Sequence, residues 1–131
     1  MATLTPTLTL TSTDATTDQL SFSVTDNLSV TAPIQSMSKV VATATGSGTI
    51  IAPASTGIRY LFVRHTGTTD GSTATVRQVD VEFTTDEAIA RLSAGEFLFM
   101  PFNHAGASVG VQLQVAHASN VLCEYAYWTK G

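Results

Sequence analysis

Apolar and polar residues alternate from the beginning of the chain. Leu4, Leu8 and Leu10 occupy even positions with threonines between most of them, and the same parity resumes from Leu20 onward. A period of two places these side chains on one face of a β-strand, whereas a helix would distribute them around its circumference. The polar residues 11–19 between the two runs are rich in Thr and Asp, which favour turns. The opening stretch therefore predicts two strands joined by a turn.

Shorter runs predict further strands and turns. The tripeptide "TDN" (25–27) predicts a second turn, and alternation resumes over residues 28–34. Strands are then expected in "KVVATATGSGTII" (39–51, with "GSG" as a hinge), "RYLFVRHTGTTDGSTATVRQVDVEF" (59–83), "EFLFMPF" (96–102), "VGVQLQV" (109–115) and "VLCEYAYW" (121–128). The stretch 59–83 predicts a hairpin, because Asp70-Gly71 is a typical turn between two apolar runs.

One stretch has a helical texture. In "TTDEAIARLSAGE" (84–96), Thr85 or Asp86 is a candidate cap of a short helical turn, and Gly95 is its candidate end. The alternative for this stretch is a loop.

The strand pattern predicts an all-β fold. About eight to nine short strands, separated by turn residues every eight to twelve positions, are typical of an antiparallel sandwich or barrel. We expect residues 1–131 to form a single antiparallel β-sandwich, jelly-roll-like or immunoglobulin-like. Residues 1–34 are expected to form a strand arm that contacts neighbouring subunits.

Composition changes this picture mainly through charge. Apolar residues make up 44% of the chain and charged residues only 12%, about half of the usual roughly 25%. Thr and Ser supply the missing polarity, and Thr favours strands because its branched Cβ is stiff. The net charge of −4 argues against nucleic-acid binding, since six scattered Lys and Arg residues neutralise few phosphates. No run approaches about 18 consecutive apolar residues, so neither a membrane helix nor an export signal is expected.

The sequence offers no strong catalytic or metal-binding motif. His65, His104 and His117 lack the spacing of metal ligands, and Cys123 is interpreted as a small buried hydrophobe rather than a reactive thiol. Asp80 and Glu82 share a strand face, on which we expect a solvated cluster paired with Arg64 or Arg77 rather than an acid–base pair. "GSG" (46–48) lacks the spacing of a serine nucleophile motif. We therefore expect no enzyme activity, no cofactor and no bound metal.

The C-terminal aromatic residues allow two interpretations. Tyr125, Tyr127 and Trp128 suit stacking on sugar rings, as in carbohydrate-binding modules, because each combines a flat apolar face with a hydrogen-bond donor. The alternative is that one side of this strand is core and the other is a subunit contact.

Two C-terminal segments and the N-terminal arm carry a family resemblance. "LSAGEFLFMPF" (92–102) and the closing "VLCEYAYWTKG" (121–131) resemble small virion structural proteins of tailed bacteriophages, especially marine and cyanobacterial ones. The matching residues are Leu92, Gly95, Glu96, Phe97, Pro101 and Glu124 to Trp128. The Thr-rich arm "ATLTPTLTLTSTDATTDQLSFSVTDNLSV" (2–30) is similar to that group as well. No catalytic residues follow from the resemblance.

The resemblance implies a non-enzymatic subunit located in the phage virion. The leading hypothesis is a capsid decoration or cement protein that forms a trimer or ring and contacts the major capsid protein or other virion subunits. A tail or neck ring component is the nearest alternative, and a carbohydrate-binding sandwich for host attachment is the alternative of a different class. Leu4, Leu8, Leu10, Tyr127 and Trp128 are the predicted interface residues. Binding to nucleic acid or membranes is not expected.

Overall fold

A computed structural model describes residues 1–31, 37–43, 48–104, 108–116 and 118–131. Within these ranges the chain forms twelve strands and no helix. The strands are β1 (Ala2–Leu4), β2 (Thr7–Ser12), β3 (Leu20–Thr25), β4 (Leu28–Val30), β5 (Ser38–Ala42), β6 (Thr49–Ser55), β7 (Arg59–His65), β8 (Val79–Phe83), β9 (Ala88–Leu92), β10 (Phe97–Phe102), β11 (Val109–Gln114) and β12 (Val121–Thr129). The predicted all-β class is confirmed.

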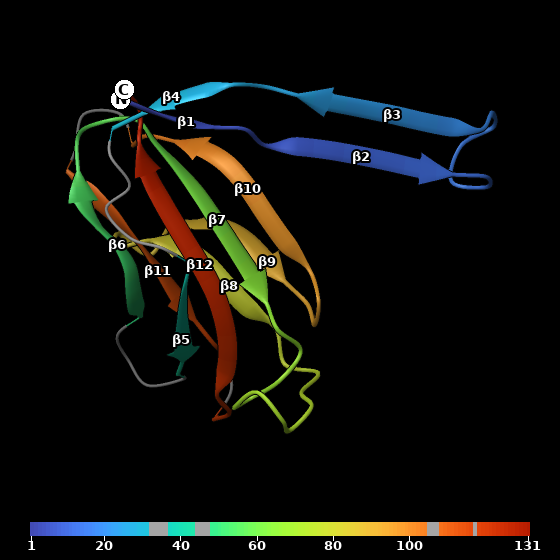
Figure 1. Cartoon of the computed structure of the whole chain (residues 1–131). Coiled ribbons are helices and arrows are strands. Elements are labelled where there is room, and N and C mark those ends of the chain that lie inside the picture. The colour runs from blue at the N-terminus through green and yellow to red at the C-terminus, as the bar shows by residue number, and fades with distance from the viewer. Residues whose placement is uncertain (32–36, 44–47, 105–107, 117) are drawn as a thin grey trace.

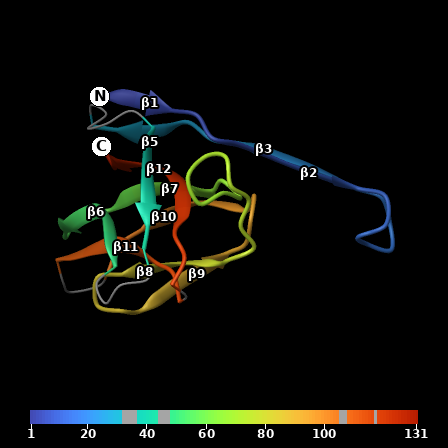
Figure 2. The same cartoon turned by 90° about the horizontal axis from the view of Figure 1, so that it is seen from below.

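Strands β5 to β12 form a sandwich of two antiparallel four-stranded sheets (Figures 1 and 2). One sheet has the order β10-β7-β12-β5 and the other β6-β11-β8-β9. The first four strands pair with the last four in reverse order: β5 with β12, β6 with β11, β7 with β10, and β8 with β9. This is one long hairpin rolled upon itself, which is the topology of the eight-stranded jelly roll. Of the two predicted sandwich types, the strand order therefore selects the jelly roll.

The core lies between the two sheets. Each strand sends alternate side chains inward, as the period-two pattern requires. Leu61, Val63 and Cys123 from the first sheet meet Val81 and Leu113 from the second, and all five are fully buried. Burial raises the pKa of the Cys123 thiol to about 12 because the apolar surroundings disfavour the thiolate. Cys123 is thus the buried hydrophobe that the sequence predicts.

The N-terminal arm is a two-stranded ribbon that projects from the sandwich (Figure 1). Strands β1 and β2 run antiparallel to β4 and β3, and the loop between Ser12 and Leu20 forms its tip. The ribbon's base is tied to the chain's end, since Val30 bridges Lys130 and the Gly131 amide donates to the Ser29 carbonyl. The predicted strand arm and its first turn are therefore present.

The predicted second turn at 25–27 is wrong. The pairings Leu4 with Leu28 and Thr7 with Thr25 keep one register, so the chain passes through "TDN" without reversing. The Asp26 amide donates to the carbonyl of Pro6, which holds the two strands together where Pro6 has no N–H to offer. Of the predicted continuation at 28–34, residues 32–34 lie outside the described residues.

The predicted 59–83 hairpin is also wrong, because β7 and β8 belong to opposite sheets. The Asp70-Gly71 turn exists, but it closes only a small loop bridged between Thr68 and Ala74. Asp70 accepts hydrogen bonds from the backbone amides of Thr73 and Ser72, which lower its pKa to about 2. The hydrogen bonds of the turn form between neighbouring residues, whereas packing of the core determines which strands pair.

The stretch with helical texture contains a strand. Asp86 adopts a φ of 64° and its amide donates to the Phe83 carbonyl, which makes a tight turn from β8 into β9. Strand β9 then pairs with β8 at the edge of the sheet, and Gly95, with a φ of 84°, leads to β10. Both the helical turn and the loop are therefore wrong for Ala88–Leu92, since tertiary pairing overrides weak helix propensity.

Candidate interaction surface

The outer face of the β10-β7-β12-β5 sheet is rich in aromatic side chains. Alternation turns Phe97 and Phe99 of β10, Tyr60 and Phe62 of β7, and Trp128 of β12 away from the core. The Tyr60 and Phe99 rings stack with centroids 6.3 Å apart, and the Phe62 and Phe97 rings lie 6.4 Å apart. We call these five residues the aromatic face. Phe97 keeps 60% of its surface exposed, which is unusual for so large an apolar side chain.

The arm has one apolar and one hydroxyl face. The opposed pairs Leu8 with Val24 and Leu10 with Phe22 lie on one side of the ribbon, because directly paired residues share a face. These four side chains are 43% to 49% exposed. The other side carries Thr and Ser pairs joined through their hydroxyl groups, at 2.9 Å between Thr7 and Thr25 and 3.2 Å between Thr9 and Ser23. The arm therefore presents an uncovered apolar face to solvent.

The apolar face of the arm and the aromatic face meet in a groove of about 670 Å³. Leu8 and Val24 of the arm line it on one side, and Phe97, Phe99 and Pro101 of β10 line it on the other. A smaller hollow of about 260 Å³ continues over the sheet. Its lining consists of Leu4, Pro6, Thr7, Met37, Phe62, Phe97, Phe99 and Trp128. The two hollows make one apolar concavity at the root of the arm.

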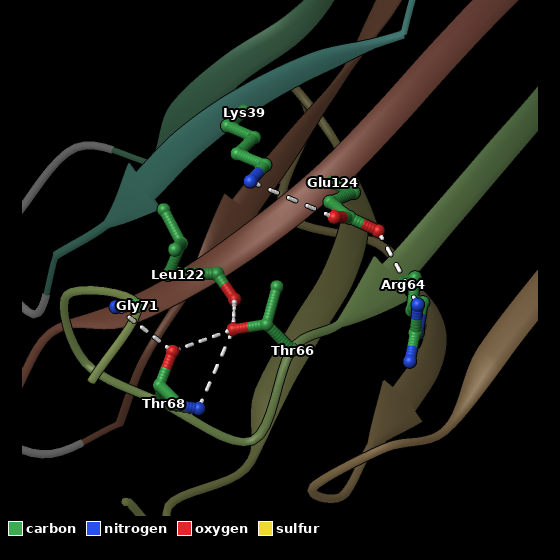
Figure 3. A network of polar contacts seen from close by, with 7 residues as sticks. All are labelled: Lys39, Arg64, Thr66, Thr68, Gly71, Leu122 and Glu124. Carbon is green, nitrogen blue, oxygen red and sulfur yellow. Dashed lines mark hydrogen bonds and ion pairs between the residues drawn. The ribbon is translucent and has the colours of Figure 1, made fainter. Parts of the chain in front are cut away.

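An ion network lies on the same outer face, beyond the aromatic residues (Figure 3). The Glu124 carboxylate forms ion pairs with Arg64 at 3.6 Å and with Lys39 at 4.0 Å. Two cations share one carboxylate, so this part of the outer face carries a net positive charge. Beside it, the Thr66 hydroxyl donates to the Leu122 carbonyl at 2.8 Å and fixes the following loop to β12.

The structure places the five predicted interface residues in different surroundings. Leu8 and Leu10 lie on the apolar face of the arm, and Leu4 and Trp128 line the smaller hollow. Tyr127 points inward and packs in the core with 7% of its surface exposed. It therefore has little surface to offer to a sugar or to another subunit. Alternation places Tyr127 in the core and Trp128 on the outer face, where Trp128 suits either a subunit contact or a sugar.

The sequence interpretation missed much of this surface. The sequence places Phe62, Phe97 and Phe99 in expected strands, and Phe22 and Val24 in the alternation of the arm, but it predicts none of them as an interface residue. Alternation with Leu98 and Met100 shows that Phe97 and Phe99 share one face of β10, but it does not show which face is outward. That depends on the second sheet, which covers the opposite side.

The other polar candidates do not converge on a site. The buried His65 accepts from the Gly67 amide at Nδ1, and its Nε2 lies 2.7 Å from the Arg77 carbonyl. His104 pairs with Glu87 at 2.9 Å, and His117 lies outside the described residues. Across the described ranges, no group of three or more His, Cys, Asp or Glu side chains is placed to hold a metal ion.

Asp80 and Glu82 have other partners than those predicted. Asp80 forms a two-bonded ion pair with Arg91 of β9, at 2.5 and 3.0 Å. Glu82 is buried, and its carboxylate accepts a hydrogen bond from the side-chain amide of Gln112 at 2.8 Å. The expected pairing with Arg64 or Arg77 is wrong because β7 and β8 are not neighbours in a sheet.

Comparison with known proteins leaves the chain defined by its fold and surface. No protein-family model, curated protein or solved structure matches it. The part of the chain that the structure describes includes no helix long and apolar enough to cross a bilayer. The class that the geometry supports is a jelly-roll β-sandwich with a projecting, partly apolar arm, and the phage resemblance stays a prediction.

Proposed function

We propose that this chain is a non-enzymatic structural subunit of a phage virion, most simply a capsid decoration or cement protein that assembles with copies of itself. The observation that carries the proposal is the uncovered apolar face of the arm beside the aromatic face. An exposed two-stranded ribbon with one apolar face is an aggregation hazard in a free monomer. In an assembly the same ribbon is covered by a neighbour and stabilises the contact.

Charge supports the same proposal. Only 12% of the residues are charged, so a neighbouring subunit would cover mainly Thr, Ser and apolar side chains. The free-energy cost of removing charged side chains from water on assembly would therefore be small. The jelly roll is an architecture of viral capsid domains, although lectin domains use it as well. Fold analogy therefore adds to the case without deciding it.

Three residues of the phage resemblance lie on the candidate surface. Phe97, Pro101 and Trp128 belong to the two quoted C-terminal segments, and all three line the concavity at the root of the arm. Others of the set, such as Leu92 and Tyr127, belong to the core. The location in the particle, with the major capsid protein or another virion subunit as partner, rests on this resemblance.

The first test is the oligomeric state of the purified chain. We expect size-exclusion chromatography with light scattering to show a trimer or larger ring that dissociates on dilution. A monomer over the whole range from micromolar to millimolar concentration would contradict self-assembly. Immunogold labelling of virions of the encoding phage then tests the location. Label on the head supports decoration, label on the tail or neck supports the ring alternative, and unlabelled particles contradict both.

A carbohydrate-binding sandwich is the second candidate, and the aromatic face is the observation that favours it. Trp128 and Phe62 offer flat surfaces for sugar rings. The lining of the smaller hollow supplies few hydrogen-bonding side chains, chiefly the Thr7 hydroxyl, whereas saccharide hydroxyls need several. A glycan array tests it: saturable binding that Trp128→Ala abolishes supports this function, and a blank array with intact protein rejects it.

A further inference from the structure

We propose that the outer half of the arm of one copy docks into the groove at the root of the arm of a second copy. This inference rests on the proposed self-assembly and names its contact. The docking segment carries Leu10 and Phe22 on its apolar face. The receiving groove lies between Leu8 and Val24 of the second copy's arm and the Phe97 side of its aromatic face.

The geometry of the arm separates the two halves of this contact. Leu8 and Val24 sit at the root, where they already line the chain's own groove. Leu10 and Phe22 form the next pair outward on the same face, and neither residue lines either hollow. Both stay about half exposed, at 46% and 48%, on the part of the chain that the structure describes. A second copy is the cover that we propose for them.

The amount of exposed surface fits a second copy. The chain exposes 7555 Å², whereas a compact monomer of 13.8 kDa exposes about 6,600 Å². The excess of about 900 Å² is the extra surface of an extended shape, and it is large enough to supply the roughly 800 Å² that each partner buries in a standard protein interface. The projecting arm is the conspicuous departure from a compact shape (Figures 1 and 2).

Charge favours the same partner. The arm's tip, residues 13–19, contains Asp14 and Asp18 and no cation. The outer face beyond Phe97 carries Lys39 and Arg64 against the single carboxylate of Glu124 (Figure 3). An arm that enters the groove and continues along the outer face brings its acidic tip toward this positive end. The chain is thus complementary to itself in both apolar surface and charge.

Arm and groove are different surfaces, so the contact is head to tail. Repetition of such a contact generates a ring when the rotation closes. This agrees with the trimer or ring of the proposed function and gives each copy one donated arm and one occupied groove.

Two single substitutions test the contact, one on each side of it. Phe22→Asp damages the arm and leaves the groove lining intact, whereas Phe97→Asp damages the groove and leaves the arm intact. Both side chains are about half exposed or more, so both variants are expected to keep the wild-type circular dichroism and melting temperature. Each is expected to weaken self-association by about tenfold or more, because a buried aromatic anchor becomes a desolvated charge. Thr11→Asp is the matched control: it adds the same charge to the neighbouring strand of the arm, on the hydroxyl face, and should leave association unchanged.

Mixing the two variants gives the sharper result. The Phe22→Asp copy has an intact groove and the Phe97→Asp copy has an intact arm, so the mixture is expected to form a one-to-one pair that neither variant forms alone. A mixture that stays monomeric would overturn the arm-in-groove contact. So would a wild-type oligomer that both substitutions leave intact, and in that case self-assembly through another surface stands. A wild-type protein that is monomeric throughout would overturn the contact and the proposed self-assembly together.

Discussion

At the scale of single residues, the Arg59 side chain links the two sheets of the sandwich. It belongs to β7 in one sheet, and its guanidinium donates to the carbonyls of Pro53 on β6 and Val109 on β11 in the other sheet. The group lies 4.5 Å from the centre of the Phe102 ring and is 97% buried. Burial lowers the pKa of Arg59, although a guanidinium remains charged in proteins. Arg59 therefore joins the two sheets by hydrogen bonds where the rest of the core joins them by apolar contact.

Replacing Arg59 with Met is expected to lower the free energy of unfolding by about 2–4 kcal/mol, because the buried Val109 carbonyl and the partly buried Pro53 carbonyl lose their donor. Urea unfolding followed by circular dichroism measures this. Arg64→Met on the same strand is the control. Arg64 is half exposed and pairs with Glu124 at 3.6 Å, so its loss should cost less than about 1 kcal/mol. Equal effects of the two substitutions would contradict the role assigned to Arg59.

At the scale of elements, the pairing of β11 with β6 contains register shifts that the sequence pattern does not predict. The register shifts between Val109 and Val111, and Gly110 lies between them. A Cβ on Gly110 would lie 2.5 Å from the Ala52 carbonyl oxygen, which is backbone and cannot move aside cheaply. The close approach of two backbones, rather than a special φ angle, is what requires glycine here.

Gly110→Ala is accordingly expected to lower the unfolding free energy by about 1–3 kcal/mol through overpacking. Thermal unfolding followed by circular dichroism gives the comparison. Gly57→Ala serves as the control, since its added Cβ meets only the Ser55 hydroxyl at an ordinary 3.6 Å. A Gly110→Ala protein as stable as Gly57→Ala would show that β6 and β11 separate more easily than their packing indicates.

At the scale of the whole molecule, the arm and the sandwich differ in how they are stabilised. The sandwich strands form two sheets around a shared core, whereas β2 and β3 of the arm each have one paired edge and no buried side chain. Local opening is easiest where backbone hydrogen bonds are exposed and few apolar contacts hold them. The arm is thus expected to be the least protected paired part of the chain when the molecule is alone.

Amide hydrogen exchange measures this difference. In dilute protein, the amides of β2 and β3 should exchange on the order of a hundredfold faster than those of β7 and β12. At concentrations where the protein associates, the arm should become protected while β7 and β12 change little. Arm protection that is the same at both concentrations, with association confirmed by light scattering, would contradict the covering of the arm by another copy.

The sequence determined what depends on the backbone of a single strand. Alternation gave the β class, the arm and the extents of the later strands, and its polar break at 11–19 gave the turn, of which 13–19 form the tip. The residue type gave the burial of Cys123. Alternation also separated Tyr127 from Trp128, because neighbouring residues on a strand point to opposite faces whatever the strand's partners are. The groups that share a face, such as Leu8 with Leu10, were therefore fixed before any partner was known.

The tertiary structure decided which strands pair and which face is covered. The hairpin expected at 59–83 is wrong because β7 pairs with β10 and β12, which are distant in sequence. Ala88–Leu92 is a strand because it pairs with the edge of β8. The second sheet covers the inner face of β10, so Phe97 lies on the outer face. No described sheet packs on the apolar face at Phe22 of the arm, so Phe22 stays about half exposed. Pairing and cover depend on the free energy of the assembled core, which no local stretch of sequence contains.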